Sequence, residues 1–349
     1  MIEIISPPPS SLRLRMDDAA LGANWRILDA MSGAATAGAA VKANAYGLGS
    51  GTITQALAGA GCRAFFVAHW GEVPELLAHV PAEQIAVLHG PLNAQDVGFA
   101  QATGTRPVLN SLPQARRWIE AGGGPCHVMV DSGMNRLGFA LDDLGDAIFA
   151  SLDIDICLSH LASADENVVQ NARQLASFEG IRQLVTAKRY SLANSAGIAL
   201  GRAYHADLTR PGIALYGGIV RPEFAGRIAQ VAFPEAAIVQ VRTLQAGDCV
   251  GYNATFTAAG PMRVGILGVG YADGYLRCWS GKGRFAWQGR EVPVLGRVSM
   301  DLTIVDLSDV PDCREGDWLG AVYDLPLAAQ TSGLSQYELL TLLGQRFSR

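Results

Sequence analysis

Short apolar runs alternate with amphipathic stretches along residues 15 to about 215 of the chain. A short apolar run bounded by turn-forming residues is typical of a buried strand, whereas a longer amphipathic stretch is typical of a helix. The pattern therefore predicts helices over residues 17–31, 74–79, 112–121 and 167–188. The eight predicted strands cover residues 39–41, 63–68, 85–89, 107–110, 126–131, 155–160, 190–194 and 206–209.

Repeated strand-then-helix units imply parallel strands, because each helix returns the chain to the edge where the previous strand began. Eight such units over about 200 residues predict a (β/α)8 TIM barrel. A doubly wound open sheet is the alternative fold. The chain has no G-x-G-x-x-G motif after its first predicted strand, which argues against that alternative.

The pattern changes near residue 230. From there, short β-type runs are separated by turn signals such as Gly281-Lys282-Gly283, which is typical of an antiparallel β domain. We place the barrel over residues 1–230 and the β domain over 231–349. The first 15 or so residues are a candidate extra strand of the β domain. The later predicted elements are strands over 236–241, 262–269, 285–287, 292–295, 302–305 and 318–322, and a helix over 335–344.

Composition and charge narrow the class of protein. A hydrophobic content of 49% with only 17% charged residues is that of a well-packed globular enzyme, not of a disordered chain. The net charge of −5, without any Lys/Arg block, argues against nucleic-acid binding. We expect neither a signal peptide nor a membrane span, because the required apolar runs are missing. Six scattered cysteines without C-x-x-C spacing indicate reduced thiols in a cytoplasmic protein.

The candidate chemistry begins with Lys42, which ends an apolar run and precedes a turn rich in Asn and Gly. Partial burial at a strand end disfavours the charged ammonium, lowers its pKa and makes the amine nucleophilic toward a carbonyl. The plainer alternative is a surface lysine whose apolar stem lies along the strand end. The residues at the other strand ends favour the nucleophile.

Polar side chains follow several other predicted strands, namely Arg136, His160, Ser195 and Arg210. In a TIM barrel the C-terminal strand ends form the face that carries active sites. The loops after the seventh and eighth strands are the usual phosphate site, because backbone N–H groups and a hydroxyl can surround an anion there. A phosphate site near a nucleophilic lysine fits pyridoxal 5′-phosphate, whose aldehyde forms a Schiff base with lysine.

The motifs that carry these residues resemble those of the alanine racemases, which belong to the barrel class of pyridoxal-phosphate enzymes. The resemblance covers nearly the whole chain, and six further motifs in the same order make it specific. The segment Val41-Lys42-Ala43-Asn44-Ala45-Tyr46-Gly47 resembles the cofactor-lysine signature. The other matching segments are residues 130–138, 160–165, 193–195, 210–217, 270–274 and 296–301.

This resemblance implies a racemase with two bases. Lys42 matches the Schiff-base lysine, which is also one base. Tyr271 matches the second base, which each active site of a homodimer takes from the partner chain. Arg136 matches the arginine near the cofactor's phenolic oxygen and the substrate carboxylate. Met300 matches the residue whose backbone N–H reaches that carboxylate, with Asp301 beside it near the entrance.

The resemblance also implies a set of cofactor-binding residues. His160 matches the histidine beside the cofactor ring, and Arg210 matches the arginine that hydrogen-bonds the pyridine nitrogen. An arginine stays charged and cannot hand its proton to that nitrogen. The ring is then a weaker electron sink, which favours racemisation over transamination. The phosphate is expected on Tyr46, Ser195, Gly212 and Ile213.

Two positions depart from the family pattern. Many members carry a carbamylated lysine seven residues before the active-site arginine, where this chain has Met129. Arg136 therefore lacks that negative partner, and Asp131 or a bound anion is the candidate replacement. Near the C-terminus, Gln345 falls where the family often places a tyrosine at the phosphate and the substrate gate.

The leading hypothesis is an alanine racemase that supplies D-alanine for peptidoglycan. A broader amino-acid or serine racemase of the same family is the closest alternative, because the gate position is altered. A basic amino-acid decarboxylase shares the layout but usually has a glycine-rich phosphate loop and a Cys-rich segment, which this chain lacks. A non-catalytic pyridoxal-phosphate carrier would be a barrel without a second domain. No metal site is expected, because His160 lacks neighbours at zinc-ligand spacing.

Overall fold

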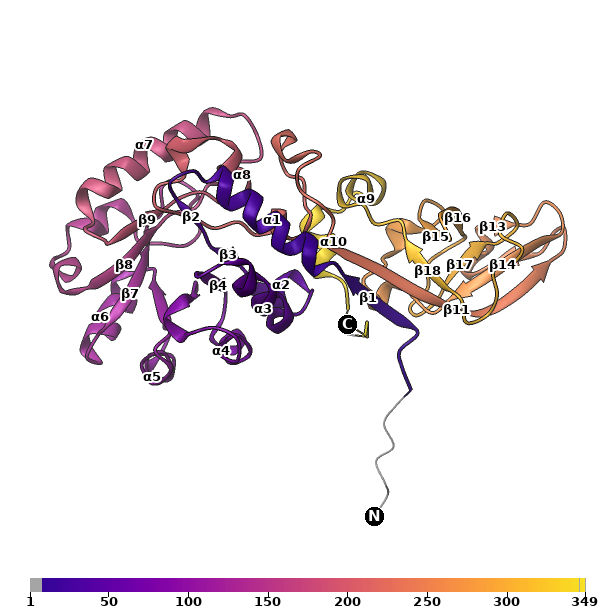
Figure 1. Cartoon of the computed structure of the whole chain (residues 1–349), viewed down its shortest axis with the longest axis horizontal. Helices are drawn as coiled ribbons and strands as arrows, with labels where there is room; N and C mark the ends of the chain where they lie inside the picture. The colour runs from indigo at the N-terminus through magenta and orange to yellow at the C-terminus, as the bar shows by residue number, and fades with distance from the viewer. Residues whose placement is uncertain (1–7, 345, 349) are drawn as a thin grey trace, which may run out of the picture. The chain divides into compact units, whose positions relative to one another are not determined.

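The computed structural model describes residues 8–344 and 346–348 of the chain (Figure 1). Two compact units divide the chain: one comprises residues 18–229, and the other combines the segments before and after it. We call the first the barrel unit and the second the β unit. The predicted combination of a TIM-like barrel with an antiparallel β domain is confirmed by the fold of these two units.

The barrel unit is built on parallel strands in the spatial order β3-β4-β5-β6-β7-β8-β9. At the open end of this order, β2 pairs in parallel with β10, and a parallel bridge joins Asn194 to Arg210. These contacts connect the last strands to the first. The strands are β2 (Thr36–Ala37), β3 (Ala39–Ala40), β4 (Phe65–Val67), β5 (Ile85–Val87), β6 (Arg106–Leu109), β7 (Pro125–Met129), β8 (Asp153–Leu158), β9 (Arg189–Ser191) and β10 (Leu208–Thr209).

Both faces of this sheet are buried, which explains why its strands are nearly continuous apolar runs in the sequence. On β8, Ile156 and Leu158 belong to one core cluster, and the intervening Cys157 belongs to another that includes residues of the helices. None of the helices in the described chain is long and apolar enough to cross a membrane. The helices are α1 (Asp18–Met31), α2 (Lys42–Tyr46), α3 (Ser50–Ala60), α4 (Val73–Leu77), α5 (Ala94–Thr103), α6 (Leu112–Glu120), α7 (Val169–Leu184) and α8 (Ser195–Ala199).

The β unit is an antiparallel sheet in the order β1-β11-β14-β17-β16-β15-β18, and β18 pairs again with β11, so the sheet closes into a barrel. The N-terminal strand β1 belongs to this unit, because Leu12 pairs with Ala236 of β11. The elements are β1 (Leu12–Met16), β11 (Ala232–Leu244), β12 (Cys249–Val250), β13 (Phe256–Thr257), β14 (Met262–Leu267), β15 (Arg284–Trp287), β16 (Arg290–Leu295), β17 (Thr303–Asp306), β18 (Trp318–Ala321), α9 (Leu325–Ser332) and α10 (Gln336–Thr341).

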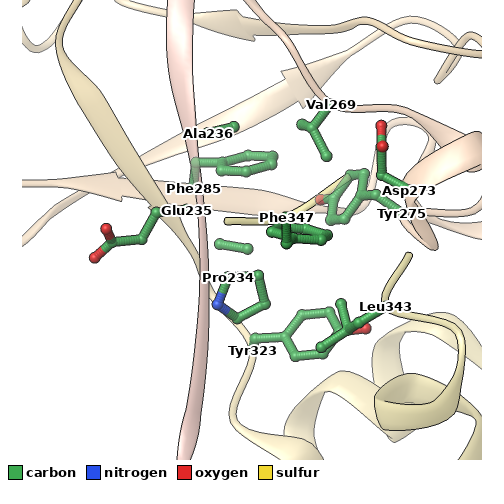
Figure 2. Close-up of a pocket in the computed structure, with 11 residues that line it drawn as sticks. Pro234, Glu235, Ala236, Val269, Asp273, Tyr275, Phe285, Tyr323, Leu343 and Phe347 are labelled. Carbon is green, nitrogen blue, oxygen red and sulfur yellow. The ribbon is translucent and has the colours of Figure 1, made fainter. Parts of the chain in front are cut away.

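Residues 346–348, the tail of the described chain, lie against the core of the β unit. Figure 2 shows Phe347 lining a small pocket together with Pro234, Phe285 and Tyr323. The Phe347 side chain is buried, and the backbone N–H of Ser348 donates to the carbonyl of Leu12 in β1. The tail therefore has a fixed position against the core.

This anchored tail carries Arg346, which joins two loops of the β unit. Its Nε and one Nη donate to the two carboxylate oxygens of Asp273 at 2.6 and 2.9 Å, and its other Nη donates to Asp301 at 2.8 Å. The Asp273 side chain is only 1% exposed and also accepts the N–H of Gly270 at 3.0 Å. A buried carboxylate of this kind needs such a charged partner.

We predict that Arg346→Ala loosens the turn that contains Asp273, because the buried carboxylate loses its cation. The expected cost of about 1–3 kcal/mol corresponds to a roughly tenfold to hundredfold rise in amide exchange over residues 270–274. Hydrogen exchange with mass spectrometry measures this directly. Arg284→Ala is the matched control, because Arg284 pairs with Glu291 at 3.7 Å on the surface, where such pairs contribute little. Equal exchange in the two variants would contradict the prediction.

Candidate active site

Lys42 lies two residues beyond β3, at the C-terminal end of that strand, and its side chain is half-buried. Burial lowers the pKa of the amine, the positive charges of Arg136 and Arg210 lower it further, and the carboxylate of Glu72 partly opposes them. A lowered pKa increases the fraction of free amine, which is the nucleophilic form. The sequence predicted a lowered pKa for Lys42, and its burial in the structure lowers the pKa in that direction.

The backbone after Lys42 forms a left-handed turn. Ala43, Asn44, Ala45 and Tyr46 have φ values of 55°, 54°, 51° and 58°. Four consecutive residues other than glycine in this region are unusual, because each costs about 1–2 kcal/mol. The N–H of Gly47 donates to the Ala43 carbonyl at 2.9 Å, which closes the turn.

This turn brings Tyr46 against the loop that follows β10. The rings of Tyr46 and Tyr216 lie 4.9 Å apart between centroids, and the Tyr216 hydroxyl donates to the Ala40 carbonyl at 2.8 Å. A Cβ atom on Gly212 would lie 2.2 Å from the Tyr46 hydroxyl, so no larger residue fits at that position. One short segment therefore carries both the lysine and a hydroxyl that reaches the loop after β10.

Ser195 brings a second hydroxyl to the same place. Its Oγ accepts the backbone N–H of Gly212 at 2.9 Å and that of Ala214 at 3.3 Å. Ser195 and Ile213 are both buried, and the Asn194 side chain caps the turn by accepting the N–H of Gly197 at 2.9 Å. Hydroxyls and backbone N–H groups that converge on a glycine form a cradle suited to a phosphate.

Arg210 is the buried cation of the site. Its guanidinium donates to the hydroxyl of Ser191 and to the carbonyl of Ser159 at 2.5 Å. Burial lowers its pKa to about 10, so the side chain remains charged at neutral pH. A guanidinium has five N–H donors, so the described bonds leave capacity for a ligand atom.

His160 follows β8 and is surrounded by positive charge. Burial, followed by the charges of Arg210, Arg136 and Lys42, lowers its pKa to about 3. The imidazole is therefore neutral at pH 7 and can donate one hydrogen bond and accept another. Within the described residues, no cluster of three or more His, Cys, Asp or Glu side chains could hold a metal ion.

Arg136 is exposed, and its charge reaches Lys42 and His160. The candidate replacement partner, Asp131, accepts the backbone N–H groups of Gly133, Met134 and Arg136 at 2.7–3.0 Å. These bonds hold the loop and occupy the carboxylate. No ion pair joins Asp131 to the Arg136 guanidinium in the described part of the chain.

Met129 shows why no acid replaces the missing lysine at its own position. Its side chain is buried in an apolar cluster inside the barrel. The apolar neighbours offer no hydrogen bonds to a charged group, so the position suits a methionine. The cluster consists of Phe66, Ala86, Val108, Met129, Ile156, Leu158 and Leu208.

Tyr271 and Met300 lie together in the β unit. The N–H of Tyr271 donates to the Ser299 carbonyl, and that of Ala272 donates to the Met300 carbonyl, both at 3.0 Å. The Arg277 guanidinium lies 5.1 Å from the centre of the half-buried Tyr271 ring. The loop that contains Tyr271 and the loop that contains Met300 are thus held as one surface.

The structure gathers the predicted residues of the barrel unit at one end of its strands, and it holds Tyr271 beside Met300 in the β unit. Gln345 lies outside the described residues. Sequence reasoning missed three charged residues that contact these segments: Glu72, Arg277 and Arg346. A search of every predicted strand end for charged residues would have found Glu72, which follows the second strand. The contacts of Arg277 and Arg346 have no signal in the sequence.

Comparison with known proteins identifies the family. Residues 16–220 match the model of the alanine racemase N-terminal domain, and residues 231–349 match that of the C-terminal domain. An alanine racemase of Acidiphilium cryptum is 41% identical, with 96% of this chain and 97% of that relative aligned. A biosynthetic alanine racemase of Agrobacterium fabrum is 42% identical over 97% of this chain and 93% of that relative.

A solved structure extends the similarity to the whole fold. The alanine racemase from Bartonella henselae, with covalently bound pyridoxal phosphate, has a TM-score of 0.90 and 35% identity to this chain. The match covers 98% of this chain and 99% of that one. Both domain models and the full-length relatives agree, so the chain belongs to the alanine racemase family.

Proposed function

We propose that this protein is a pyridoxal-phosphate-dependent alanine racemase that interconverts L-alanine and D-alanine. The observation that carries the proposal is the placement of Lys42 and the hydroxyls of Tyr46 and Ser195 at the same end of the barrel strands. A nucleophilic amine near an anion cradle matches an aldehyde that bears a phosphate. Family membership supports the same cofactor and the same reaction.

The residues present fit this cofactor. Tyr46, Ser195, Gly212 and Ile213 would hold the phosphate, and Lys42 would hold the aldehyde carbon. The bound group supplies electron withdrawal, which acidifies the α-hydrogen of an attached amino acid. Arg210 would donate a hydrogen bond to the ring nitrogen and keep its own proton, because it remains charged at neutral pH. A neutral His160 would lie beside the ring.

Two residues would move the α-proton. Racemisation removes this proton from one face of the substrate and returns it to the opposite face, so two bases on opposite faces are the simplest arrangement. We assign the D-isomer's proton to Nζ of Lys42 and the L-isomer's proton to the hydroxyl of Tyr271. Arg136 and the backbone N–H of Met300 would hold the substrate carboxylate.

We propose a homodimer in which each chain contributes Tyr271 to its partner's active site. Lys42 and Tyr271 belong to different compact units of the chain, and membership of the alanine racemase family supports a tyrosine supplied by the partner chain. The supply of D-alanine for peptidoglycan is the proposed role. A cytoplasmic location is supported by six free cysteines, because unpaired thiols are typical of a reducing compartment.

The central prediction concerns Lys42. The wild-type protein is expected to be yellow, to racemise alanine in both directions, and to trap its cofactor on Lys42 when treated with borohydride. Lys42→Ala removes the attachment site, so covalent trapping and racemisation should both be lost. Peptide mass spectrometry locates the reduced cofactor. Trapping of Lys42→Ala at another major lysine would refute the assignment.

The substrate range is measured in the same assay by comparing rates on L-alanine, L-serine and L-lysine. A clear preference for alanine supports the proposed function. Similar rates on serine would favour the broader racemase, and release of carbon dioxide from basic amino acids would favour the decarboxylase.

The assignment of the two bases predicts an asymmetric loss in Tyr271→Phe. Racemisation should fall about 10²–10⁴-fold in both directions, because one positioned base is missing. In deuterated water, D-alanine should still exchange its α-hydrogen through Lys42, whereas L-alanine should remain almost unlabelled. Proton NMR of both isomers measures the exchange. Equal labelling, or faster labelling of L-alanine, would show that the bases are assigned incorrectly.

The shared active site predicts recovery of activity when two inactive variants exchange subunits. A heterodimer of Lys42→Ala and Tyr271→Phe chains contains one site with both bases intact. Mixed protein should therefore regain part of the wild-type rate, up to about a quarter if subunits exchange at random and each site works independently. Native mass spectrometry verifies the exchange. An inactive mixture after verified exchange would argue for sites built from one chain.

A further inference from the structure

We propose that Glu72 is the positioning residue for Lys42, because its carboxylate ties the left-handed turn behind the lysine to the end of strand β4. The inference rests on the proposed function only in treating Lys42 as the nucleophile. Glu72 acts on Lys42 through the backbone of the residues that follow the lysine.

The contacts of Glu72 join two separate segments. One carboxylate oxygen accepts the backbone N–H groups of Ala43 at 2.5 Å and Asn44 at 3.3 Å. The other oxygen accepts the N–H groups of Ala68 at 2.7 Å and His69 at 3.0 Å. Each oxygen of a carboxylate can accept two hydrogen bonds, so one side chain satisfies four backbone donors.

The left-handed turn requires such support. Four consecutive residues other than glycine lie at positive φ, which is unfavourable for a residue with a Cβ atom, so neighbouring contacts must offset the cost of the turn. Charge-assisted hydrogen bonds are among the strongest available contacts. Glu72 binds the N–H groups of the first two residues of the turn, directly after Lys42. The second half is held differently, by burial of Ala45 and Tyr46.

The same carboxylate also sets the charge around the amine. Among the described groups that shift the pKa of Lys42, Arg136 and Arg210 are positive and lower it, and only Glu72 is negative and raises it. His89 and His160 also feel the charge of Lys42. Removal of the Glu72 charge should therefore lower the pKa of Lys42 and increase its free amine near neutral pH. Removal of Glu72 should also displace the amine of Lys42 from its reactive position, and this displacement should lower the reactivity of the amine.

Two variants separate position from charge. Glu72→Gln keeps the length of the side chain but removes its charge. It also replaces one acceptor oxygen with an NH2 group, so the side chain can accept from only one of the two pairs of N–H groups. Glu72→Asp keeps the charge but is one methylene shorter, so it cannot hold both segments. Glu75→Gln is the matched control: Glu75 lies three residues away and accepts from Ser50 and Gly51 at the start of α3, without contacting the Lys42 turn.

The first measurement is amide exchange in the full-length protein without cofactor. Both Glu72 variants should increase exchange over residues 43–47 by about tenfold or more, because a charge-assisted hydrogen bond contributes about 1.5–3 kcal/mol. Glu75→Gln should change this segment much less than either Glu72 variant, because Glu75 reaches the turn only through Ser50, whose N–H donates to Asn44. Unchanged exchange over residues 43–47 in the Glu72 variants would overturn the proposal.

The second measurement is the rate at which added pyridoxal phosphate attaches to Lys42, trapped with borohydride over a range of pH. In Glu72→Gln the midpoint of the pH profile should move down, while the alkaline plateau falls roughly 10- to 100-fold because the free amine is misplaced. Glu72→Asp should lower the plateau with a smaller change of midpoint. A wild-type plateau in both variants would overturn the positioning role.

The two proposals fail in different ways. If the wild-type protein does not attach the cofactor to Lys42, the proposed function fails, whereas the exchange measurement still tests the contact of Glu72 with the turn. If Glu72→Gln does not fold, Glu72→Asp provides the same two measurements. Equal effects of Glu72→Asp and Glu75→Gln on the plateau would show a general loss of stability and would overturn the proposal.

Discussion

The structure of the candidate site depends on a change to a left-handed backbone conformation directly after Lys42. Left-handed residues turn the chain so that the lysine lies at one end of the turn and Tyr46, against Gly212, lies at the other. The turn is unfavourable by itself for residues with a Cβ atom. It persists because Glu72 binds its first N–H groups, because Asn44 accepts the N–H of Ser50 at 2.8 Å, and because its last residues are buried.

Much of this architecture could be predicted from the sequence. The strands of the barrel are buried on both faces, so they are continuous apolar runs that stand out between amphipathic helices. Once a parallel barrel is inferred, residues that follow different strands must share one end of it, which explains why Lys42, His160 and Arg210 gather as expected. In the second half of the chain, turn-forming residues between short β-type runs predicted the antiparallel strands, because there the local composition determines the local structure.

The partner that each polar side chain binds could not be predicted. Composition suggested an ordinary turn after Lys42, because alanine and tyrosine rarely adopt positive φ, and nothing local indicates that Glu72 stabilises the exception. Asp131 was a reasonable candidate partner for Arg136, yet its oxygens bind the N–H groups of its own loop. Arg346 reaches Asp273 across 73 residues of sequence, from a tail whose next residue, Phe347, is buried in the core of the β unit.

The charge balance of the site explains how these features act together. Lys42, Arg136 and Arg210 concentrate positive charge, burial together with these charges keeps His160 neutral, and Glu72 is the acid that acts on the lysine. The position that could have balanced Arg136 is the apolar Met129. An excess of positive charge in a partly buried site favours anionic ligands. A phosphate and an amino-acid carboxylate would supply the missing negative charge, and Glu72, bonded to the backbone, would not compete with them for the guanidinium groups.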